Sequence, residues 1–406
     1  MRRNRALLIA AVIAVAIIVI TVRLGDEDPP HNNTIITNGL GVSIHKGAKP
    51  SDIQAIADAG FKWVRIDIFW SDVEKTKGVY DFKSAGYDEI NEALKEYDLR
   101  PYYILNYGND LYGDERSVTT KQRRQAFAKY AEAVVKRYGD QGGIWEIWNE
   151  PNTETFWSDQ PSEVDYDRLV KTVSPVIRQY DSDSTIVAPA LAGVSEEALT
   201  WLRKVVDCGL LDYVDAVSVH PYQRENPETV ISRYAELREI VGKDTPIISG
   251  EWGYSTTEVS EKQQAEYMAR MFLTNSLSDI PISVWYDWKN DGETQSNREH
   301  NFGLVSYHST PKLSYLATQT LTTQLDGYHY SKRIKTQNPN DFILEFKNGG
   351  DKAIVFWTTE SSHNVRISQD IGEGSLISML GAKRSVTWSD YIDLNMQTGP
   401  SYLVIK

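Results

Sequence analysis

Two glutamates stand in settings that suit paired-carboxylate chemistry. Glu150 lies in the run Trp-Asn-Glu-Pro-Asn and Glu251 lies in Ser-Gly-Glu-Trp-Gly, and an apolar stretch precedes each run. Cleavage of an acetal needs one carboxyl group that is protonated, to assist the departing oxygen, and one that is ionised, to meet the cationic centre. Environments that separate the two pKa values allow both states at one pH. Glu150 and Glu251 are therefore candidates for such a pair.

Short apolar runs alternate with longer helical patterns from Leu40 to about Leu325, and these elements must position the two glutamates. The expected strands are residues 40–45, 63–69, 101–106, 144–149, 185–189, 214–220, 246–252 and 282–287. Eight strand–helix alternations predict an α/β fold of the (β/α)8 TIM barrel type rather than an open doubly wound sheet. No Gly-x-Gly-x-x-Gly follows the first strand, which argues against a dinucleotide fold.

Functional groups of such a barrel lie at the carboxyl ends of its strands. Seven of the eight expected strands end in polar or aromatic residues. Besides the two glutamates, the residues expected to contact a substrate are His45, Arg65, Asn106, Asn149, His220, Tyr222 and Trp285.

Side-chain alternation along a strand sharpens this expectation, because every second residue faces the barrel interior. Glu146, Trp148 and Glu150 share one parity, which predicts that Glu146 lies deeper in the barrel as a partner for Arg65. The same rule pairs other polar residues on one face: Arg65 with Asp67, Ser218 with His220, and Ser249 with Glu251.

The segment from Trp148 to Asn152 resembles the strand-four motif of the clan A retaining glycoside hydrolases. The resemblance implies that Glu150 is the general acid/base and that Glu251, at the end of strand seven, is the nucleophile. Residues 63–70, 220–222 and 302–312 also resemble segments of this clan, and the likeness covers most of residues 38–325. It further implies that Arg65 contacts the nucleophile, that His220 lies near it, and that Trp285 lines the subsite for the glycone sugar.

Within the clan, the chain most resembles family 39 and its relatives, which include β-xylosidases and exopolysaccharide endoglycosidases associated with membranes. This resemblance implies retaining hydrolysis of β-glycosidic bonds in an extracytoplasmic polysaccharide, with endo action. One alternative is an exo-acting enzyme like a β-xylosidase or a β-glucosidase. Another is a catalytically silent barrel that binds polysaccharide.

No cofactor or metal is expected. The chain has one cysteine, Cys208, which we expect to be a small buried side chain, and no Cys/His cluster has the spacing of a zinc site. The formal net charge of −13 argues against nucleic acid as a partner. Trp70 and Trp157 are further candidates for stacking against a sugar.

The N-terminus has the pattern of a signal anchor. Three arginines lie within residues 2–5, residues 6–22 are uncharged, and three acidic residues follow at 26–28. The uncharged run would measure about 25 Å as a helix, at the short end for a bilayer. The positive-inside rule then predicts a transmembrane anchor over residues 1–24, a linker over residues 25–37 and a catalytic domain outside the cytoplasm. The alternative is a cleaved signal peptide and a secreted enzyme.

Beyond residue 327 the helical period disappears. Short apolar runs at residues 342–346, 353–358, 364–367, 385–388 and 402–405 are separated by turn-forming residues. The pattern predicts a small β-sandwich over residues 327–406, packed with a structural role on a catalytic barrel of residues 38–326.

Overall fold

The computed structural model describes residues 34–113, 115–158 and 160–405. The predicted anchor over residues 1–24 and most of the predicted linker lie outside these residues. Within the described part of the chain, no helix is both long and apolar enough to cross a bilayer.

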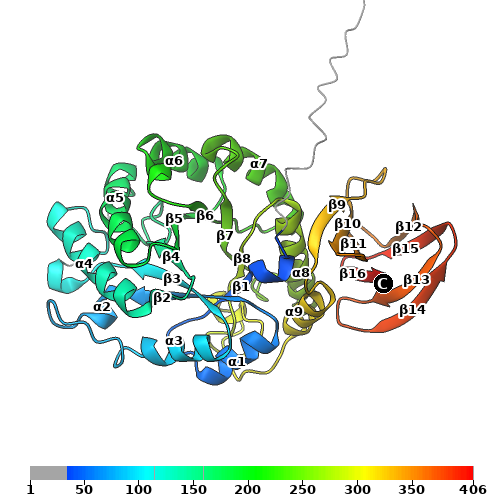
Figure 1. Cartoon of the computed structure of the whole chain (residues 1–406), viewed down its shortest axis with the longest axis horizontal. Helices are drawn as coiled ribbons and strands as arrows, with labels where there is room; N and C mark the ends of the chain where they lie inside the picture. The colour runs from blue at the N-terminus through cyan, green and yellow to red at the C-terminus, as the bar shows by residue number, and fades with distance from the viewer. Residues whose placement is uncertain (1–33, 114, 159, 406) are drawn as a thin grey trace, which may run out of the picture.

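Eight parallel strands close into a barrel, as the sequence predicts (Figure 1). Each strand pairs with the next, and β8 returns to β1. The strands are β1 (Leu40–Ser43), β2 (Trp63–Phe69), β3 (Arg100–Asn106), β4 (Ile144–Ile147), β5 (Thr185–Ala192), β6 (Ala216–His220), β7 (Ile247–Trp252) and β8 (Ser283–Trp285).

Helices follow each strand and surround the barrel. They are α1 (Pro50–Asp58), α2 (Trp70–Val73), α3 (Tyr87–Glu96), α4 (Lys121–Tyr138), α5 (Glu163–Tyr180), α6 (Glu196–Asp207), α7 (Val230–Val241), α8 (Glu261–Leu277) and α9 (Leu313–Gln324). Hydroxyl side chains define several helix starts. Thr120, Ser162 and Ser195 each accept a hydrogen bond from a backbone N–H of the first turn, in α4, α5 and α6 respectively.

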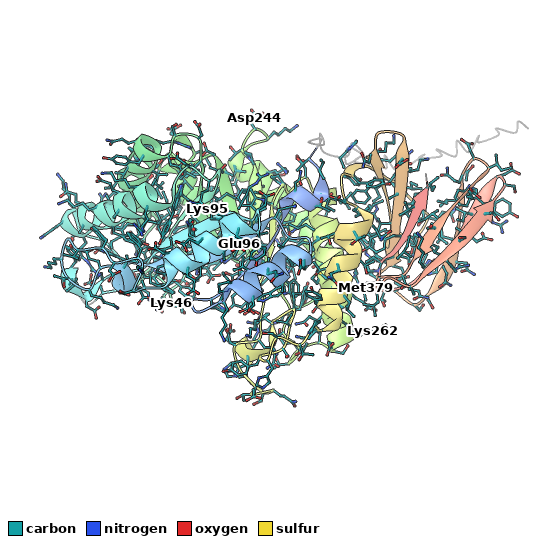
Figure 2. The ribbon with its side chains drawn as sticks, turned by 60° about the horizontal axis from the view of Figure 1, so that its bottom comes forward. Lys46, Lys95, Glu96, Asp244, Lys262 and Met379 are labelled. Atoms are coloured by element: carbon teal, nitrogen blue, oxygen red, sulfur yellow. The ribbon has the colours of Figure 1, made fainter. Side chains whose placement is uncertain are left out.

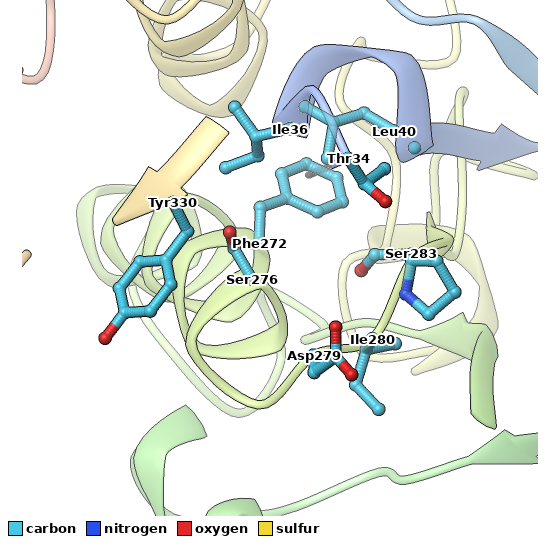
Figure 3. Close-up of a pocket in the computed structure, with 11 residues that line it drawn as sticks. Thr34, Ile36, Leu40, Phe272, Ser276, Asp279, Ile280, Ser283 and Tyr330 are labelled. Carbon is cyan, nitrogen blue, oxygen red and sulfur yellow. The ribbon is translucent and has the colours of Figure 1, made fainter. Parts of the chain in front are cut away.

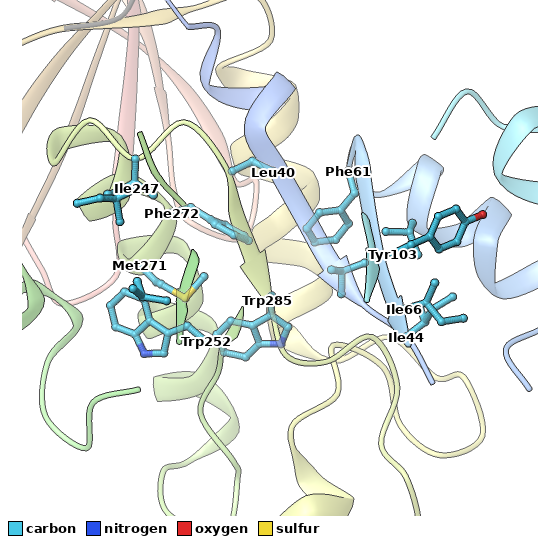
Figure 4. Close-up of a cluster of buried hydrophobic side chains, with 14 of the residues drawn as sticks. Leu40, Ile44, Phe61, Ile66, Tyr103, Ile247, Trp252, Met271, Phe272 and Trp285 are labelled. Atoms are coloured by element: carbon cyan, nitrogen blue, oxygen red, sulfur yellow. The ribbon is translucent and has the colours of Figure 1, made fainter. Parts of the chain in front are cut away.

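Apolar side chains fill the lower end of the barrel interior. One buried cluster takes a residue from most of the strands: Trp63, Tyr102, Ile144, Val187, Ala216, Ile248 and Val284. The outward parity of the strands packs beneath the helices in a second, larger cluster, part of which Figure 4 shows. With the bottom of the barrel sealed by apolar groups, the inward polar side chains gather toward the carboxyl ends of the strands.

The C-terminal region consists of two antiparallel sheets. One has six strands in the order β14-β13-β16-β11-β10-β9, and the other pairs β12 with β15. The strands are β9 (His329–Arg333), β10 (Asp341–Asn348), β11 (Asp351–Thr358), β12 (His363–Ser368), β13 (Gly372–Ile377), β14 (Lys383–Trp388), β15 (Tyr391–Met396) and β16 (Ser401–Ile405). The predicted β-structure of this region is confirmed, although β9, β13 and β15 were not among the expected strands.

Alternation in the six-stranded sheet explains how it joins the barrel. Phe342 and Trp357 belong to the apolar cluster that continues under the barrel helices. Ile343 and Phe356 point the other way, into a separate cluster shared with the two-stranded sheet. Met379 belongs to the same cluster as Phe342 and Trp357 and lies where the barrel meets the C-terminal sheets (Figure 2).

The described chain begins at the bottom of the barrel. Ile35 pairs with His329 of β9, and Ile36 is buried in the 3-10 turn η1 (Ile36–Gly39) that leads into β1. A cavity of about 30 Å³ lies here, between η1, α8 and β9 (Figure 3). This volume has room for about one water molecule.

Candidate active site

Arg65 is the centre of the polar network in the barrel mouth. Its side chain is 3% exposed, and its Nε and Nη2 donate to Glu146 Oε2 at 3.0 and 2.7 Å. Nη1 donates to Glu251 Oε2 at 2.5 Å, and Nη2 also donates to Asn149 Oδ1 at 2.9 Å. The guanidinium therefore joins the ends of β2, β4 and β7.

Glu146 has the position that strand parity predicts, deep in the barrel beneath the mouth. Its carboxylate is fully buried and also accepts hydrogen bonds from Tyr102 Oη, at 2.8 Å, and from Ser218 Oγ. All of these hydrogen-bond donors to the Glu146 carboxylate are neighbouring side chains. Glu146 therefore holds Arg65 in place and has no open path to a substrate.

Glu251 is held in the ionised state. Burial opposes ionisation, but His220 and Arg65 nearby, with a hydrogen bond from Tyr222, lower the net pKa of Glu251 below its ordinary value. Tyr222 Oη donates to Glu251 Oε1 at 2.8 Å. The Glu251 side chain is 14% exposed, so its carboxylate remains accessible from the mouth.

Glu150 faces Glu251 across His220. His220 Nδ1 lies 2.8 Å from Glu150 Oε1 and 3.9 Å from Glu251 Oε1. The other ring nitrogen, Nε2, lies 3.2 Å from Arg65 Nη2. An ionised carboxylate can only accept, so Nδ1 carries the proton that Glu150 accepts. One carboxylate oxygen of Glu150 and one of Glu251 lie within 4.8 Å of each other.

Two departures from regular strand geometry bring these carboxylates into the mouth. After β4, Trp148 and Glu150 adopt positive φ angles of 73° and 48°, which non-glycine residues rarely adopt. In β7 the register shifts between Ser249 and Trp252, so a bulge re-aims Glu251. The prediction that the Ser249 and Glu251 side chains lie on the same face of β7 is therefore wrong. A Cβ on Gly250 would instead point inward, 3.0 Å from Tyr102 Oη.

The positive φ angles also correct the expected parity of strand four. Trp148 packs in the outer cluster, with its ring centroid 5.7 Å from that of Phe127 in α4, while Glu146 faces inward. The alternation fails because both Trp148 and Glu150 leave the extended conformation.

Asn149 and Asn106 lie at neighbouring strand ends. Asn149 Nδ2 donates to Tyr107 Oη at 3.2 Å. Asn106 is fully buried, and its Nδ2 donates to Asp67 Oδ1 at 2.7 Å. Burial raises the pKa of Asp67 despite the opposing effects of Arg65 and Asn106. Asn106 therefore does not face the barrel mouth itself; it contacts Asp67.

His45 lies on the β1–β8 side of the mouth. Its Nε2 is 3.4 Å from an oxygen of Asp287 and 3.4 Å from an oxygen of Asp291. Burial lowers the pKa of His45, but the two carboxylates outweigh it and bring the pKa to about 9. Burial raises the pKa of Asp287 to about 7 against the effect of His45.

Trp285 is not where the sequence analysis expects it. The side chain is fully buried among apolar residues, and its indole N–H donates to the Phe302 carbonyl at 3.3 Å (Figure 4). Val284 faces the barrel interior, so side-chain alternation points Trp285 outward, and Tyr286 is the residue that faces the barrel mouth. Tyr286 is partly exposed and its ring contacts those of His45 and Phe302.

Three other expectations also change. Trp70 and Trp157 are fully buried in the outer cluster and have no surface for stacking on a sugar. Cys208 caps α6 and is half-buried rather than buried.

Sequence reasoning missed several residues of the mouth. Tyr107 lies in the loop after β3, where its ring stacks on Phe156 with centroids 5.7 Å apart. Arg116 covers the Tyr107 ring at 4.6 Å. Loop residues follow no strand alternation, so no pattern marks them. Tyr286, in contrast, could have been found from the inward parity of Val284.

Comparison with known proteins identifies the family. Residues 30–292, more than half of the chain, match the family described as Cellulase (glycosyl hydrolase family 5). A β-xylosidase of Caldicellulosiruptor saccharolyticus is 23% identical over 357 residues, which cover 77% of this chain and 71% of that protein. A β-xylosidase of Geobacillus stearothermophilus is 24% identical over 298 residues, or 64% of this chain and 57% of that protein.

A solved structure supports the likeness to family 39. A family 39 glycoside hydrolase from the gut symbiont Bacteroides cellulosilyticus superposes with a TM-score of 0.80 at 26% identity, over 93% of this chain and 83% of that one. The resemblance derived from the sequence is confirmed. The chain is a clan A retaining glycoside hydrolase: its barrel belongs to the cellulase family (glycosyl hydrolase family 5), and its relatives and structure resemble family 39.

Proposed function

We propose that Glu251 is the nucleophile and Glu150 the general acid/base in hydrolysis of β-glycosidic bonds. The observation that carries this proposal is the separation of their carboxylate oxygens, within 4.8 Å. Carboxyl groups about 5–5.5 Å apart permit direct attack on the anomeric carbon, whereas inverting enzymes need a wider gap for water.

The first step forms a covalent glycosyl ester. A Glu251 oxygen attacks the anomeric carbon while Glu150 delivers its proton to the departing glycosidic oxygen, and the bond between that oxygen and the anomeric carbon breaks. In the second step Glu150 takes a proton from water, and the water oxygen displaces Glu251 from the sugar. The two inversions retain the configuration of the anomeric carbon.

The surrounding groups support these roles. Arg65 and Tyr222 each hydrogen-bond a different oxygen of Glu251, which fixes the orientation of the carboxylate and favours its ionised state. His220 donates to Glu150 from Nδ1 and orients its carboxyl group. Asn149, held by Arg65, presents its amide nitrogen beside the mouth and is proposed to donate to the sugar 2-hydroxyl.

The chemistry is tested with Glu150→Gln and Glu251→Gln on two substrates. Both variants should lose several orders of magnitude in kcat on a polysaccharide. On an aryl glycoside with an acidic phenol, which departs without protonation, Glu150→Gln should still form the glycosyl ester in a burst, while Glu251→Gln should not. Turnover near that of the unmodified enzyme in either variant contradicts the assignment.

We propose an extracytoplasmic polysaccharide as the substrate, with endo action. The endo mode rests on the resemblance to exopolysaccharide endoglycosidases. Exo action as a β-xylosidase is the second candidate, because two of the relatives are β-xylosidases. A time course on a ladder of β-linked oligosaccharides separates the two: intermediate lengths at the first time point support endo cleavage, and a single monosaccharide supports exo cleavage.

The proposed location outside the cytoplasm rests on residues 1–28. Their arginines, uncharged run and acids follow the positive-inside pattern of an anchor. Protease treatment of intact cells should digest the catalytic domain if the proposal holds, while a cytoplasmic marker stays protected. Recovery of the enzyme in the culture medium would instead support the secreted form.

A further inference from the structure

We infer that His45, Asp287 and Asp291 form a binding site for one divalent cation at the edge of the barrel mouth, with Zn²⁺ as the best match. The site is separate from the proposed catalytic pair and does not depend on the proposed function.

The positions of the ligand atoms fit a single ion. His45 Nε2 lies 3.4 Å from Asp287 Oδ2 and 3.4 Å from Asp291 Oδ2, and the three groups offer atoms that all lie within 4.8 Å of one another. Zinc binds imidazole nitrogen and carboxylate oxygen at about 2.0–2.2 Å, so tetrahedral ligands are separated by roughly 3.3–3.6 Å. Both measured separations fall in that interval, and a water molecule can fill the fourth position.

Asp287 supplies the second, independent observation. Its side chain is 1% exposed, and among the described residues its only ion-pair partner is the His45 ring nitrogen at 3.4 Å, with no closer hydrogen-bond donor to either carboxylate oxygen. A buried carboxylate with so few donors is costly unless a cation compensates it, either a protonated His45 or a metal ion that both groups bind. Asp287 and Asp291 both line a cavity of about 340 Å³, which gives an ion and its water room beside the three groups.

The lysines around this cavity have other partners. Lys46 lies 2.7 Å from Asp72, and Lys289 lies 3.9 Å from Asp52. In the described part of the chain, neither Asp287 nor Asp291 forms an ion pair with a lysine or arginine. Lys312, a further cation near Asp287, donates to the Gly303 carbonyl at 2.7 Å.

Backbone pairing holds the ligands in register. His45 follows β1, and Asp287 follows β8, the strand that closes the barrel against β1. Trp288 N donates to the Ser43 carbonyl at 2.9 Å, which ties the two strand ends together beside the site. Asp291 belongs to the segment that continues from β8 toward α9. An ion here would fasten that segment to β1.

A second group of possible ligands, Glu150, His220 and Glu251, gives a matched control. Arg65 donates to Glu251 at 2.5 Å, so a guanidinium already compensates that carboxylate and a metal cation is disfavoured there. A variant of Glu251 should therefore leave binding at the His45 site intact.

The test uses the full chain in detergent, stripped of metal with a chelator and then titrated with Zn²⁺ in a calorimeter. We expect about one high-affinity Zn²⁺ per chain and a rise in Tm on saturation. His45→Gln and Asp291→Asn, both at partly exposed positions, should each weaken binding at least tenfold, while Glu251→Gln should bind as the unmodified chain does.

Co²⁺ provides a readout that is specific for the ligands. The chain should develop the visible absorption of a four- or five-coordinate Co²⁺ site, and His45→Gln should lose it. The inference is overturned if no Zn²⁺ binds, if the His45 and Asp291 variants bind as tightly as the unmodified chain, or if Glu251→Gln abolishes binding. None of these results bears on the assignment of Glu150 and Glu251.

Discussion

Removing the hydroxyl group of Tyr222 should move the acid limit of catalysis to higher pH. The phenol donates to Glu251 Oε1 at 2.8 Å and favours the ionised nucleophile. In Tyr222→Phe this donor is lost, so the pKa of Glu251 must rise. A hydrogen bond to a charged group contributes about 1.5–3 kcal/mol. At 1.36 kcal/mol per pKa unit, the expected shift is about 1–2 units.

The assay is the pH dependence of kcat/KM, because its acid limb reports ionisation of the essential base in the free enzyme. An aryl glycoside with an acidic phenol is the suitable substrate, since its departure does not need Glu150. The unmodified enzyme should lose activity only below the ordinary pKa range of glutamic acid, because the pKa of Glu251 is lowered. Tyr222→Phe should lose activity at a pH about 1–2 units higher.

Tyr286→Phe is the matched control. Tyr286 lies in the same mouth, but its hydroxyl donates to Glu299, at 3.4 Å, rather than to Glu251. Its removal should leave the position of the acid limb unchanged. An unshifted limb in Tyr222→Phe, or an equal shift in both variants, refutes the reasoning that the Tyr222 hydrogen bond sets the ionisation of Glu251.

Two further predictions concern buried charges and are read from denaturant unfolding. Arg65→Met leaves the carboxylate of Glu146 buried without its cation, which should cost about 3–5 kcal/mol of stability. The double variant with Glu146→Gln should recover part of that loss, and a double variant less stable than the single one contradicts the account. Trp357→Phe removes the indole donor to Glu228 Oε1, at 2.6 Å, and should cost about 1–3 kcal/mol. Because Arg270 still pairs with Glu228, the loss of stability should be smaller than that of Arg65→Met. An equal loss would contradict the account in which Arg270 compensates Glu228 after the Trp357 hydrogen bond is removed.

Strand alternation predicted the site well wherever the strands are regular. In β2 it placed Arg65 inward and Val64 in the outer cluster, and in β4 it identified Glu146 as the buried partner of Arg65. It also pointed to the inward face of β6, where Ser218 and His220 hydrogen-bond Glu146 and Glu150.

The prediction failed where the backbone departs from the extended conformation. The bulge of β7 and the positive φ angles at Trp148 and Glu150 change which residues face the mouth. Gly250 inside β7 is typical of a bulge, but no residue type marks the positive φ angles after β4. Trp285 was assigned from resemblance, although the inward parity of Val284 favours Tyr286. His45 and Asp291 lie near opposite ends of the barrel sequence and come together only because β8 pairs with β1. The sequence pattern alone therefore did not predict that they are neighbours.

The burial of Ile36 beneath the barrel has a consequence for orientation. The chain comes to β1 from the amino ends of the strands, whereas Glu150 and Glu251 lie at the carboxyl ends. The seven-residue strands β2 and β3 separate these two faces by roughly 20 Å. A tether attached ahead of Ile36 would therefore hold the enzyme by its base, with the catalytic mouth turned away from the surface to which it is tethered. Such an orientation would leave the mouth open on the side away from that surface.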